Sequence, residues 1–303
     1  ALSGYMVGYC WNVMWLDAIM IFPIVILGLE RLIDKKDGRI YCLALFYALY
    51  CNYYIAFMIC IFAVIWYLFY SFKSVKQFFF RGIAFTLYSL LAAGMAAVLL
   101  IPAYLGIKQT SSGEEMVLPE HSFLTNAADL LNRQFAMWTP ISHDNFDGNA
   151  NLYIGIFTIL AVVLYLFNQQ IKISDKIKKI LLIGFFYLSF SEMILNFIWH
   201  GFHDQYGIPN RFSFLFGFVL LTMVWEVFEH LEGMKGWHIA LACMAGAGLL
   251  AYARMKGTQP LEDEAYGVVG MLCLLYGMLL FFYTLSRKRK VLYKVVFCAV
   301  AII

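Results

Sequence analysis

The fold of this chain is decided by a 32-residue apolar run at residues 41–72, YCLALFYALYCNYYIAFMICIFAVIWYLFYSF. As one α-helix it would be about 48 Å long, whereas the hydrocarbon core of a bilayer is about 30 Å thick. We therefore expect two shorter helices with a break at Asn52, on the outer side of a membrane. Because unpaired backbone groups at such a depth need protein or a wet cavity around them, Asn52, Tyr53 and Tyr54 are expected to line a cavity.

The distribution of lysine and arginine supports this break. With it, the alternating spans place 17 of the 22 Lys and Arg residues in the loops of one side and 5 in the loops of the other. Without it, the split becomes 9 against 13, which is nearly no bias. Positively charged loops stay in the cytoplasm. The sequence thus predicts an oriented, polytopic membrane protein whose outer side carries five cations, Lys108, Arg133, Arg211, Arg254 and Lys256.

The amino-acid composition is also that of a membrane protein. Hydrophobic residues make up 63% of the chain and charged residues 14%, whereas a soluble domain is nearer half apolar and a quarter charged. We expect an all-α, polytopic transmembrane helical bundle, with a single transmembrane domain over residues 1–303. Its further spans are predicted at 13–30, 83–106, 152–168, 180–199, 212–229, 237–253, 267–285 and 291–303. Since the chain begins without Met and ends inside an apolar run, we expect it to be a fragment of a longer protein.

Two other classes of function are disfavoured by the same pattern. The basic clusters are short and lie between spans, which suits anchoring at anionic lipid and not a nucleic-acid surface. The seven cysteines have no metal or redox spacing. We interpret them as small hydrophobic residues.

The longest outer segment, residues 107–151, is predicted to be functional, since long loops are seldom idle. Within it, apolar residues recur at steps of three and four, as on one face of a helix: Leu124, Ala128, Leu131, Phe135 and Trp138. This face predicts a helix in the outer interface with Trp138 at headgroup depth. The alternative is a segment that only packs on neighbouring helices.

Asp17 and Arg211 are the two charged residues at outer span ends that most suggest chemistry. A carboxylate at the depth of Asp17 is costly and usually functional, although it could instead stabilise the start of its helix. Arg211 could hold a phosphate in bidentate fashion. The alternative for Arg211 is a salt bridge to Asp204 or to another nearby carboxylate.

Polar residues in two outer segments could join them. His200, His203 and Asp204 lie close together in WHGFHDQYG and could contact a glycan or phosphate, ligate a metal, or be ordinary loop residues. In PISHDNFDGN, His143, Asp144 and Asp147 most resemble turn residues, with cation or substrate binding as the alternative.

Buried carboxylates have a structural interpretation. Glu192 and Asn196 lie one helical turn apart within the predicted span 180–199. Because a buried glutamate must be paired, neutral or functional, we expect Glu192 to pair with Asn196 or a neighbouring helix. Glu226 and Glu229, near the inner end of their span, are expected to reach cytoplasmic water.

Five segments resemble the YfhO family of bacterial membrane proteins. They are LSGYMVGYCWNVMWLDAIMIFPIVILGLERLI at 2–33, CNYYIAFMICIF at 51–62, LLIPAYLGI at 99–107, LYIGI at 152–156 and WHGFHDQYGIPNRFSFLFGF at 199–218. The resemblance covers roughly residues 1–225, and its first and last segments are the most specific.

The YfhO family is similar to the GT-C membrane glycosyltransferases. The resemblance implies a multi-pass enzyme of the bacterial plasma membrane that works on the extracytoplasmic face. It would transfer sugar from a polyprenyl-phosphate donor to a cell-envelope polymer such as lipoteichoic acid. GT-C enzymes carry a key acidic residue in their first outer loop, which would precede Ala1, and the family usually continues into an outer C-terminal region.

The residues fit this activity as follows. Arg211, with His200 or His203 and beside Asp204, would hold the donor phosphate and stabilise the leaving group. Asp17 or the upstream acid would activate the acceptor hydroxyl. Asn52, Tyr53, Tyr54 and Trp138 would line the path of sugar and lipid. No cofactor is indicated, and a divalent cation stays open. The rival functions are a transporter or flippase of lipid-linked sugar, and a non-catalytic membrane scaffold.

Overall fold

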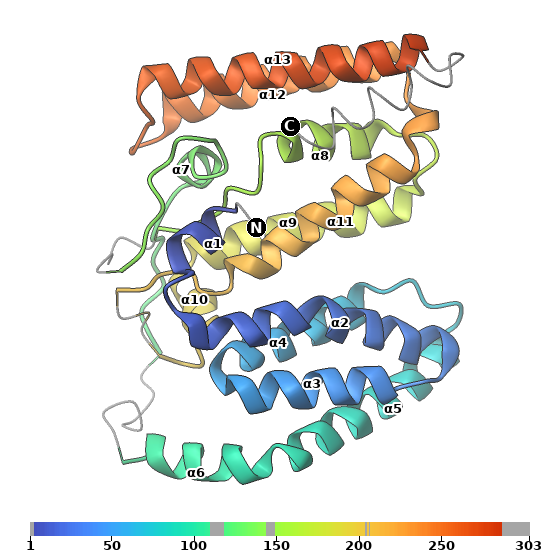
Figure 1. Ribbon diagram of the computed structural model, residues 1–303, viewed down its shortest axis with the longest axis vertical. Coiled ribbons are helices and arrows are strands. Elements are labelled where there is room, and N and C mark those ends of the chain that lie inside the picture. The colour runs from blue at the N-terminus through green and yellow to red at the C-terminus, as the bar shows by residue number, and fades with distance from the viewer. Residues whose placement is uncertain (1–2, 110–117, 144–148, 204, 206, 287–303) are drawn as a thin grey trace.

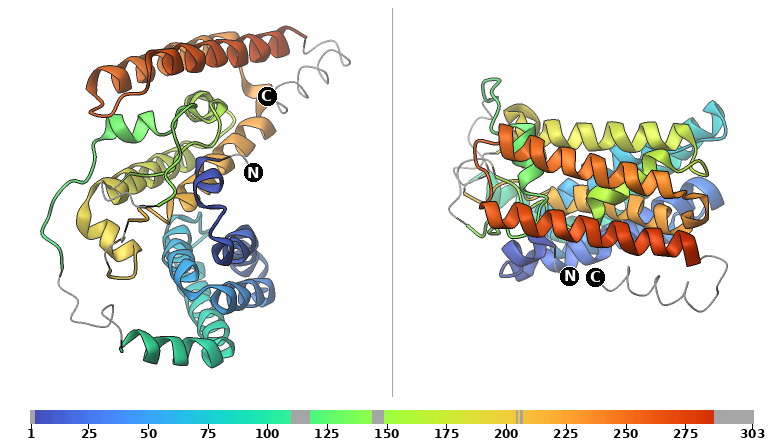
Figure 2. Two further views of the ribbon diagram at one scale, coloured as in Figure 1. Left: turned by 60° about the vertical axis from the view of Figure 1, so that its left-hand side comes forward. Right: turned by 90° about the horizontal axis from the view of Figure 1, so that it is seen from above.

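In the computed structural model, residues 3–109, 118–143, 149–203, 205 and 207–286 are described, and they form an all-α helical bundle, as predicted. The long helices lie side by side with their axes roughly along one direction (Figure 1; Figure 2, right), whereas the short helix α7 (Ala127–Asn132) is seen end-on in Figure 1. Their bounds are α1 Gly4–Tyr9, α2 Val13–Lys35, α3 Arg39–Cys51, α4 Tyr53–Phe69, α5 Val75–Met95, α6 Ala97–Ile107, α7 Ala127–Asn132, α8 Phe157–Phe167, α9 Ile173–Ser191, α10 Met193–Trp199, α11 Ser213–Glu229, the 3-10 helix η2 Leu231–Gly233, α12 Gly236–Lys256 and α13 Asp263–Ser286.

The predicted break at Asn52 is confirmed. Helix α3 ends at Cys51 and α4 begins at Tyr53, with Asn52 extended between them. The Asn52 Oδ1 accepts a hydrogen bond from the Ile55 N–H (2.9 Å), and its Nδ2 donates to the Met14 carbonyl of α2 (3.2 Å). One side chain therefore caps α4 and ties the break to the start of α2.

The turn at Asn52 lets α3 pack back along α2, and a glycine sets how closely. A Cβ added at Gly28 of α2 would lie 2.5 Å from the Tyr41 backbone nitrogen of α3. Small residues allow helices to approach in this way in a membrane. The backbones of α2 and α3 are therefore in close contact at Gly28 and Tyr41.

The bundle has two ends that separate the charged residues. The loops after α2, α4, α8 and α11 gather at one end, and α1, α7, α10 and the α3–α4 break at the other (Figure 1). We call these the Lys179 end and the Arg211 end. Of the 17 Lys and Arg residues assigned to one side, the 12 that are described lie toward the Lys179 end. The five cations assigned to the opposite side, Lys108, Arg133, Arg211, Arg254 and Lys256, lie toward the Arg211 end. The predicted separation of charge therefore survives in the fold.

Four described helices are long and apolar enough to cross a membrane, judged by length and composition: α2, α5, α12 and α13. Two spans predicted as single helices are divided. The span 83–106 is α5 and α6, which meet at Ala96. The span 180–199 is α9 and α10, which meet at Glu192. The predicted span 291–303 lies outside the described residues.

Glu192 explains the second division. Its carboxylate accepts hydrogen bonds from the backbone N–H groups of Ile194 (3.1 Å) and Leu195 (2.8 Å), so it caps α10. The expectation that Glu192 is structurally paired holds, but its partners are backbone groups and not Asn196. Segment 122–124 supplies the backbone around the break, because the Leu124 N–H donates to the Ser191 carbonyl (2.7 Å) and the Met193 N–H to the Ser122 carbonyl (3.0 Å).

The helix expected in the outer interface is shorter and more buried than the apolar repeat suggested. Helix α7 has six residues, and Ala128 and Leu131 on its predicted apolar face are buried, as is Phe135 beyond it. It packs against α12 and α9. The structure therefore agrees with the alternative, a segment that packs on neighbouring helices.

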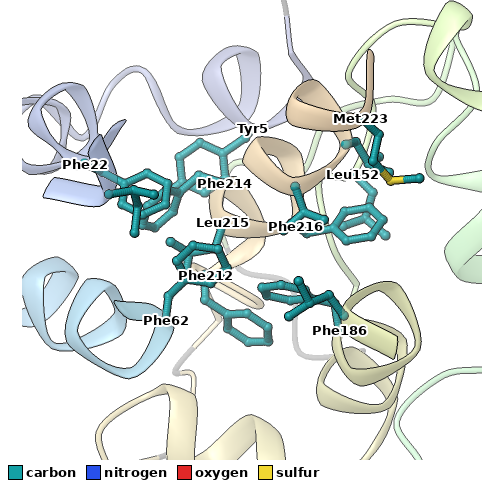
Figure 3. Close-up of a cluster of buried hydrophobic side chains, with 14 of the residues drawn as sticks. Tyr5, Phe22, Phe62, Leu152, Phe186, Phe212, Phe214, Leu215, Phe216 and Met223 are labelled. Atoms are coloured by element: carbon teal, nitrogen blue, oxygen red, sulfur yellow. The ribbon is translucent and has the colours of Figure 1, made fainter. Parts of the chain in front are cut away.

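Aromatic residues at the start of α11 form a core that packs against α2 on one side and α9 on the other. Figure 3 shows Phe214 near Phe22 of α2, and Phe216 toward Phe186 of α9. The Phe212 ring, directly before α11, stacks on the Trp199 ring with their centroids 4.8 Å apart. This core fixes the segment that enters α11, which carries Arg211.

At the Lys179 end, a buried ion pair joins α9 to α11. Lys179 is 8% exposed; its Nζ lies 3.6 Å from Glu226 Oε1 and donates to the Thr222 hydroxyl (2.6 Å). The Tyr165 hydroxyl donates to the other Glu226 oxygen (3.1 Å). Glu226 is thus paired with Lys179 while its side chain stays 31% exposed, and Glu229 is exposed as expected.

Replacing Asn52 by Ala is expected to destabilise the folded protein by about 1 kcal/mol, because the cap of α4 is lost. Asn12→Ala is the matched control, since Asn12 precedes α2 without a side-chain capping hydrogen bond. Thermal unfolding in detergent measures both. Equal losses of stability in the two variants would contradict the capping role.

Replacing Lys179 by Met is expected to cost about 3 kcal/mol, because it leaves a half-buried carboxylate without its cation. The double change Lys179→Met with Glu226→Leu should recover most of that loss. The exposed pair of Arg254 and Asp263 (2.8 Å) is the control, and Arg254→Met should cost less than about 1 kcal/mol. Chemical unfolding of the four proteins tests this, and a double variant no more stable than Lys179→Met would count against the pair.

Candidate functional site

Arg211 lies in the loop between α10 and α11 and holds that loop closed. Its Nε donates to the Ile208 carbonyl (3.0 Å), and its Nη2 donates to the Gln205 carbonyl (2.7 Å). The loop can turn this sharply because Gly201 and Gly207 adopt positive φ angles of 72° and 74°. The sequence placed Arg211 correctly at the start of a helix, but it gave no sign that the guanidinium binds its own loop.

Aromatic rings from three other elements surround this guanidinium. Its Cζ lies 5.0 Å from the centroid of the Tyr54 ring of α4 and 5.8 Å from that of the Trp15 ring of α2. Tyr9 of α1 donates its hydroxyl proton to the Pro209 carbonyl (2.7 Å), beside Arg211. Tyr5 packs edge-on against Tyr9, with their ring centroids 5.1 Å apart. We call Arg211 and these four rings the Arg211 cage.

The electrostatics of the cage leave the guanidinium facing neutral groups. Burial raises the pKa of Tyr9 well above its usual value, partly offset by the Arg211 charge, so this phenol stays protonated. The Tyr5 hydroxyl is buried and has no hydrogen-bond partner among the described residues. Within that part of the chain, the polar partners of Arg211 are carbonyl oxygens, one imidazole nitrogen and the Tyr54 hydroxyl. The alternative partner Asp204 lies outside the described residues.

His200 adjoins the cage but is fully engaged as a structural residue. It is completely buried, and burial lowers its pKa to about 3. Its Nδ1 donates to the Asn196 carbonyl (2.8 Å), and its Nε2 accepts the Arg211 backbone N–H (3.4 Å). A neutral ring with both nitrogens occupied positions the Arg211 backbone and offers nothing to a ligand. His203 is half-buried in the turn after α10.

The other residues expected near Arg211 divide into two groups. Tyr54 joins the cage, while its neighbours Asn52 and Tyr53 lie at the same break, Tyr53 being 39% exposed. Asp17 is exposed on α2, whereas Trp15 and Ala18 on the same helix are buried. Two residues along an α-helix turn the side chain about 200° around the axis. Asp17 and Trp15 therefore point in nearly opposite directions, and Asp17 stands outside the cage.

Trp138 lies in a different place, against Arg133. The Arg133 Cζ is 4.3 Å from the centroid of the Trp138 ring, and both line a cavity of about 200 Å³. Arg133 was counted among the five outer cations but was not singled out. The sequence signal that could have found it is its position five residues before Trp138, in a segment already expected to be functional.

Among the remaining candidates, His143 is exposed and its Nδ1 lies 2.9 Å from the Ser142 hydroxyl. Asp144 and Asp147 lie outside the described residues. In the described ranges, no three His, Cys, Asp or Glu side chains gather where they could hold a metal ion. The six cysteines of those ranges are all free.

The low pKa of His200 predicts a dependence of stability on pH. Below about pH 6.5 the unfolded chain protonates this histidine while the folded chain does not, so stability falls as the pH drops toward 3. Between pH 6.5 and 5 the loss should be about 2 kcal/mol. His200→Gln should remove this part of the slope, and His121→Gln, at an exposed histidine, should keep it. Thermal unfolding measured across this pH range tests the prediction. An equal dependence of stability on pH in the wild type and both variants would show that His200 is not the group responsible.

Comparison with known proteins supplies the family. Residues 1–303 match the family described as bacterial membrane protein YfhO, which extends the resemblance seen in residues 1–225 to the whole chain. No curated protein and no solved structure matches the chain. The separated basic loops, the apolar helices and this match lead to one conclusion: the chain belongs to the YfhO family of bacterial membrane proteins.

Proposed function

We propose that the protein is a membrane glycosyltransferase that takes sugar from a polyprenyl-phosphate donor and passes it to a cell-envelope glycopolymer, such as lipoteichoic acid. In this proposal the Arg211 end faces the outside of the cell, because the opposite end carries most of the basic residues. Donor and acceptor would meet at that outer end.

The observation that carries the proposal is the Arg211 cage. Its cation faces carbonyl oxygens and aromatic rings among the described residues, and the buried Tyr5 hydroxyl beside it lacks a partner there. Buried polar groups are normally satisfied. An anionic ligand would supply both an acceptor for the hydroxyl and a counter-charge for the guanidinium.

The chemistry asked of the cage is stabilisation of the leaving group. When the sugar leaves its polyprenyl phosphate, negative charge builds on the phosphate oxygens. A preorganised cation in a site that excludes water stabilises such charge more than water does. Aromatic rings suit the sugar and prenyl portions of the donor.

The general base is assigned to the acid expected upstream of Ala1, with Asp17 as the second candidate. Asp17 lies on the exposed face of α2, away from the buried Trp15 of the cage. An activating base must come within hydrogen-bond distance of the acceptor hydroxyl. The position of Asp17 therefore favours the upstream acid.

The test is transfer of radiolabelled sugar from an undecaprenyl-phosphate donor by the purified full-length protein in lipid vesicles. Turnover supports the enzyme, movement of the donor across the bilayer without turnover selects the flippase, and neither selects the scaffold. Arg211→Gln should lower the rate of transfer about 100-fold through lost stabilisation of charge.

Arg254→Gln is the matched control, because Arg254 lies at the same end, and its side chain is 57% exposed on a surface ion pair. It should leave transfer at the wild-type rate. Asp17→Asn separates the two candidates for the base: a loss there of similar size would assign the base to Asp17. If the Arg211→Gln variant transferred sugar at the wild-type rate, the cage would have no role in the reaction.

A further inference from the structure

A cavity lined by charged side chains lies at the Lys179 end, between α2, α4, α9 and α11. It has a volume of about 290 Å³. Its walls carry three carboxylates and two ammonium groups, which belong to Glu30, Asp175, Glu226, Lys178 and Lys179. We call this cavity the Glu30 pocket.

Four of these five charges are already matched within the wall. Lys179 pairs with Glu226 (3.6 Å). Lys178 donates to the Ser71 hydroxyl (2.6 Å), which in turn donates to Asp175 Oδ1 (3.2 Å). Ser71 thus connects the second lysine to the second carboxylate, and Lys178 has no direct contact with a carboxylate among the described residues.

Glu30 is the carboxylate that lacks a cation. It is half-buried, and its Oε1 accepts the indole N–H of Trp66 (3.1 Å). In the described ranges it forms no salt bridge, because Lys179 on the same wall pairs with Glu226. Carboxylates that are removed from water normally have a partner of opposite charge. The pocket therefore has one negative charge that a cationic group could match.

The pocket lies at the depth of lipid headgroups. Glu30 is five residues before the end of α2, and Lys178 lies in the first two turns of α9. Five residues of helix are about 8 Å long, and the headgroup layer of one leaflet is about 5 to 7 Å thick. In the orientation proposed above, this layer belongs to the cytoplasmic leaflet.

We propose that the Glu30 pocket binds the headgroup of a phospholipid that carries a primary ammonium, of which phosphatidylethanolamine is the simplest. The ammonium has three N–H donors and would pair with Glu30, while Lys178 would contact the lipid phosphate. An anionic headgroup would instead meet the repulsion of Glu30 and Asp175. The described residues offer no cluster of ligands for a metal ion. This inference is independent of the proposed glycosyltransferase function.

Native mass spectrometry of the purified full-length protein in detergent measures the bound lipid directly. Phosphatidylethanolamine, phosphatidylcholine and phosphatidylglycerol with the same acyl chains are offered in equal amounts. Phosphatidylethanolamine should be retained about tenfold more than phosphatidylcholine, whose quaternary ammonium cannot donate a hydrogen bond, and more than phosphatidylglycerol. Glu30→Gln should remove this preference, since glutamine keeps an acceptor for the Trp66 N–H but carries no charge.

Glu229→Gln is the matched control, because Glu229 is an exposed carboxylate at the same end. It should retain phosphatidylethanolamine as the wild type does. Thermal unfolding shows whether each variant is folded, and Lys178→Gln, at a half-buried side chain, is a second variant that should weaken retention several-fold. Equal retention of the three lipids by the wild type, or an unchanged preference in Glu30→Gln, would overturn the proposal.

A soluble competitor separates a lipid ligand from a free amine. Phosphoethanolamine has the same ammonium and phosphate without the acyl chains, so it should displace the lipid only at much higher concentration. Displacement at a concentration equal to that of the lipid would show that the pocket takes a soluble amine, and it would overturn the assignment to a lipid. None of these measurements involves sugar transfer, so their failure would leave the proposed glycosyltransferase function standing.

Discussion

The structure depends on pairing the backbone N–H and C=O groups wherever a helix breaks inside an apolar bundle. Such groups have no water to bind at that depth, and leaving them unpaired costs several kcal/mol. Asn52 and Glu192 meet this requirement with side-chain oxygens that accept the first N–H groups of α4 and α10. Both breaks also determine the site, since Tyr54 lies two residues after the first cap and α10 leads directly into His200 and the Arg211 loop.

The two ends of the bundle hold their cations in different ways. Lys179 has a carboxylate partner, so its charge is cancelled locally and the pair serves to join α9 to α11. Arg211 is held by carbonyl dipoles and ring faces, which orient the guanidinium but leave its net charge in place. An arginine cannot lose its proton to escape this situation. Among the described residues, the difference separates a charge paired with a carboxylate from one that is not, and it is the second that we propose for an anionic ligand.

The distribution of lysine and arginine over the whole chain predicted one feature of the fold, the break at Asn52. The charge separation required a break in the run at residues 41–72, because leaving it out reverses the side of every later loop. The divisions at Ala96 and Glu192 carry no such signal. Glu192 sits in an apolar run, and its break is supported by Ser122 and Leu124, which are about 70 residues away in the chain. These hydrogen bonds join segments that are distant in the sequence. The periodicity of apolar residues within one short segment therefore cannot predict them.

The candidate site shows the same limit at the level of side chains. Residue type made Arg211 and Trp138 candidates, but it could not tell that His200 is engaged by two backbone contacts or that Asp17 points away from the cage. Helix α1 was missed because six residues do not form a stable helix alone, and it exists through its contacts with Tyr153 and Pro209. Its tyrosines complete the Arg211 cage, while its Gly4 lines the cavity beside Arg133 and Trp138. Since one short helix contributes to both the cage and this cavity, the two cannot be arranged independently.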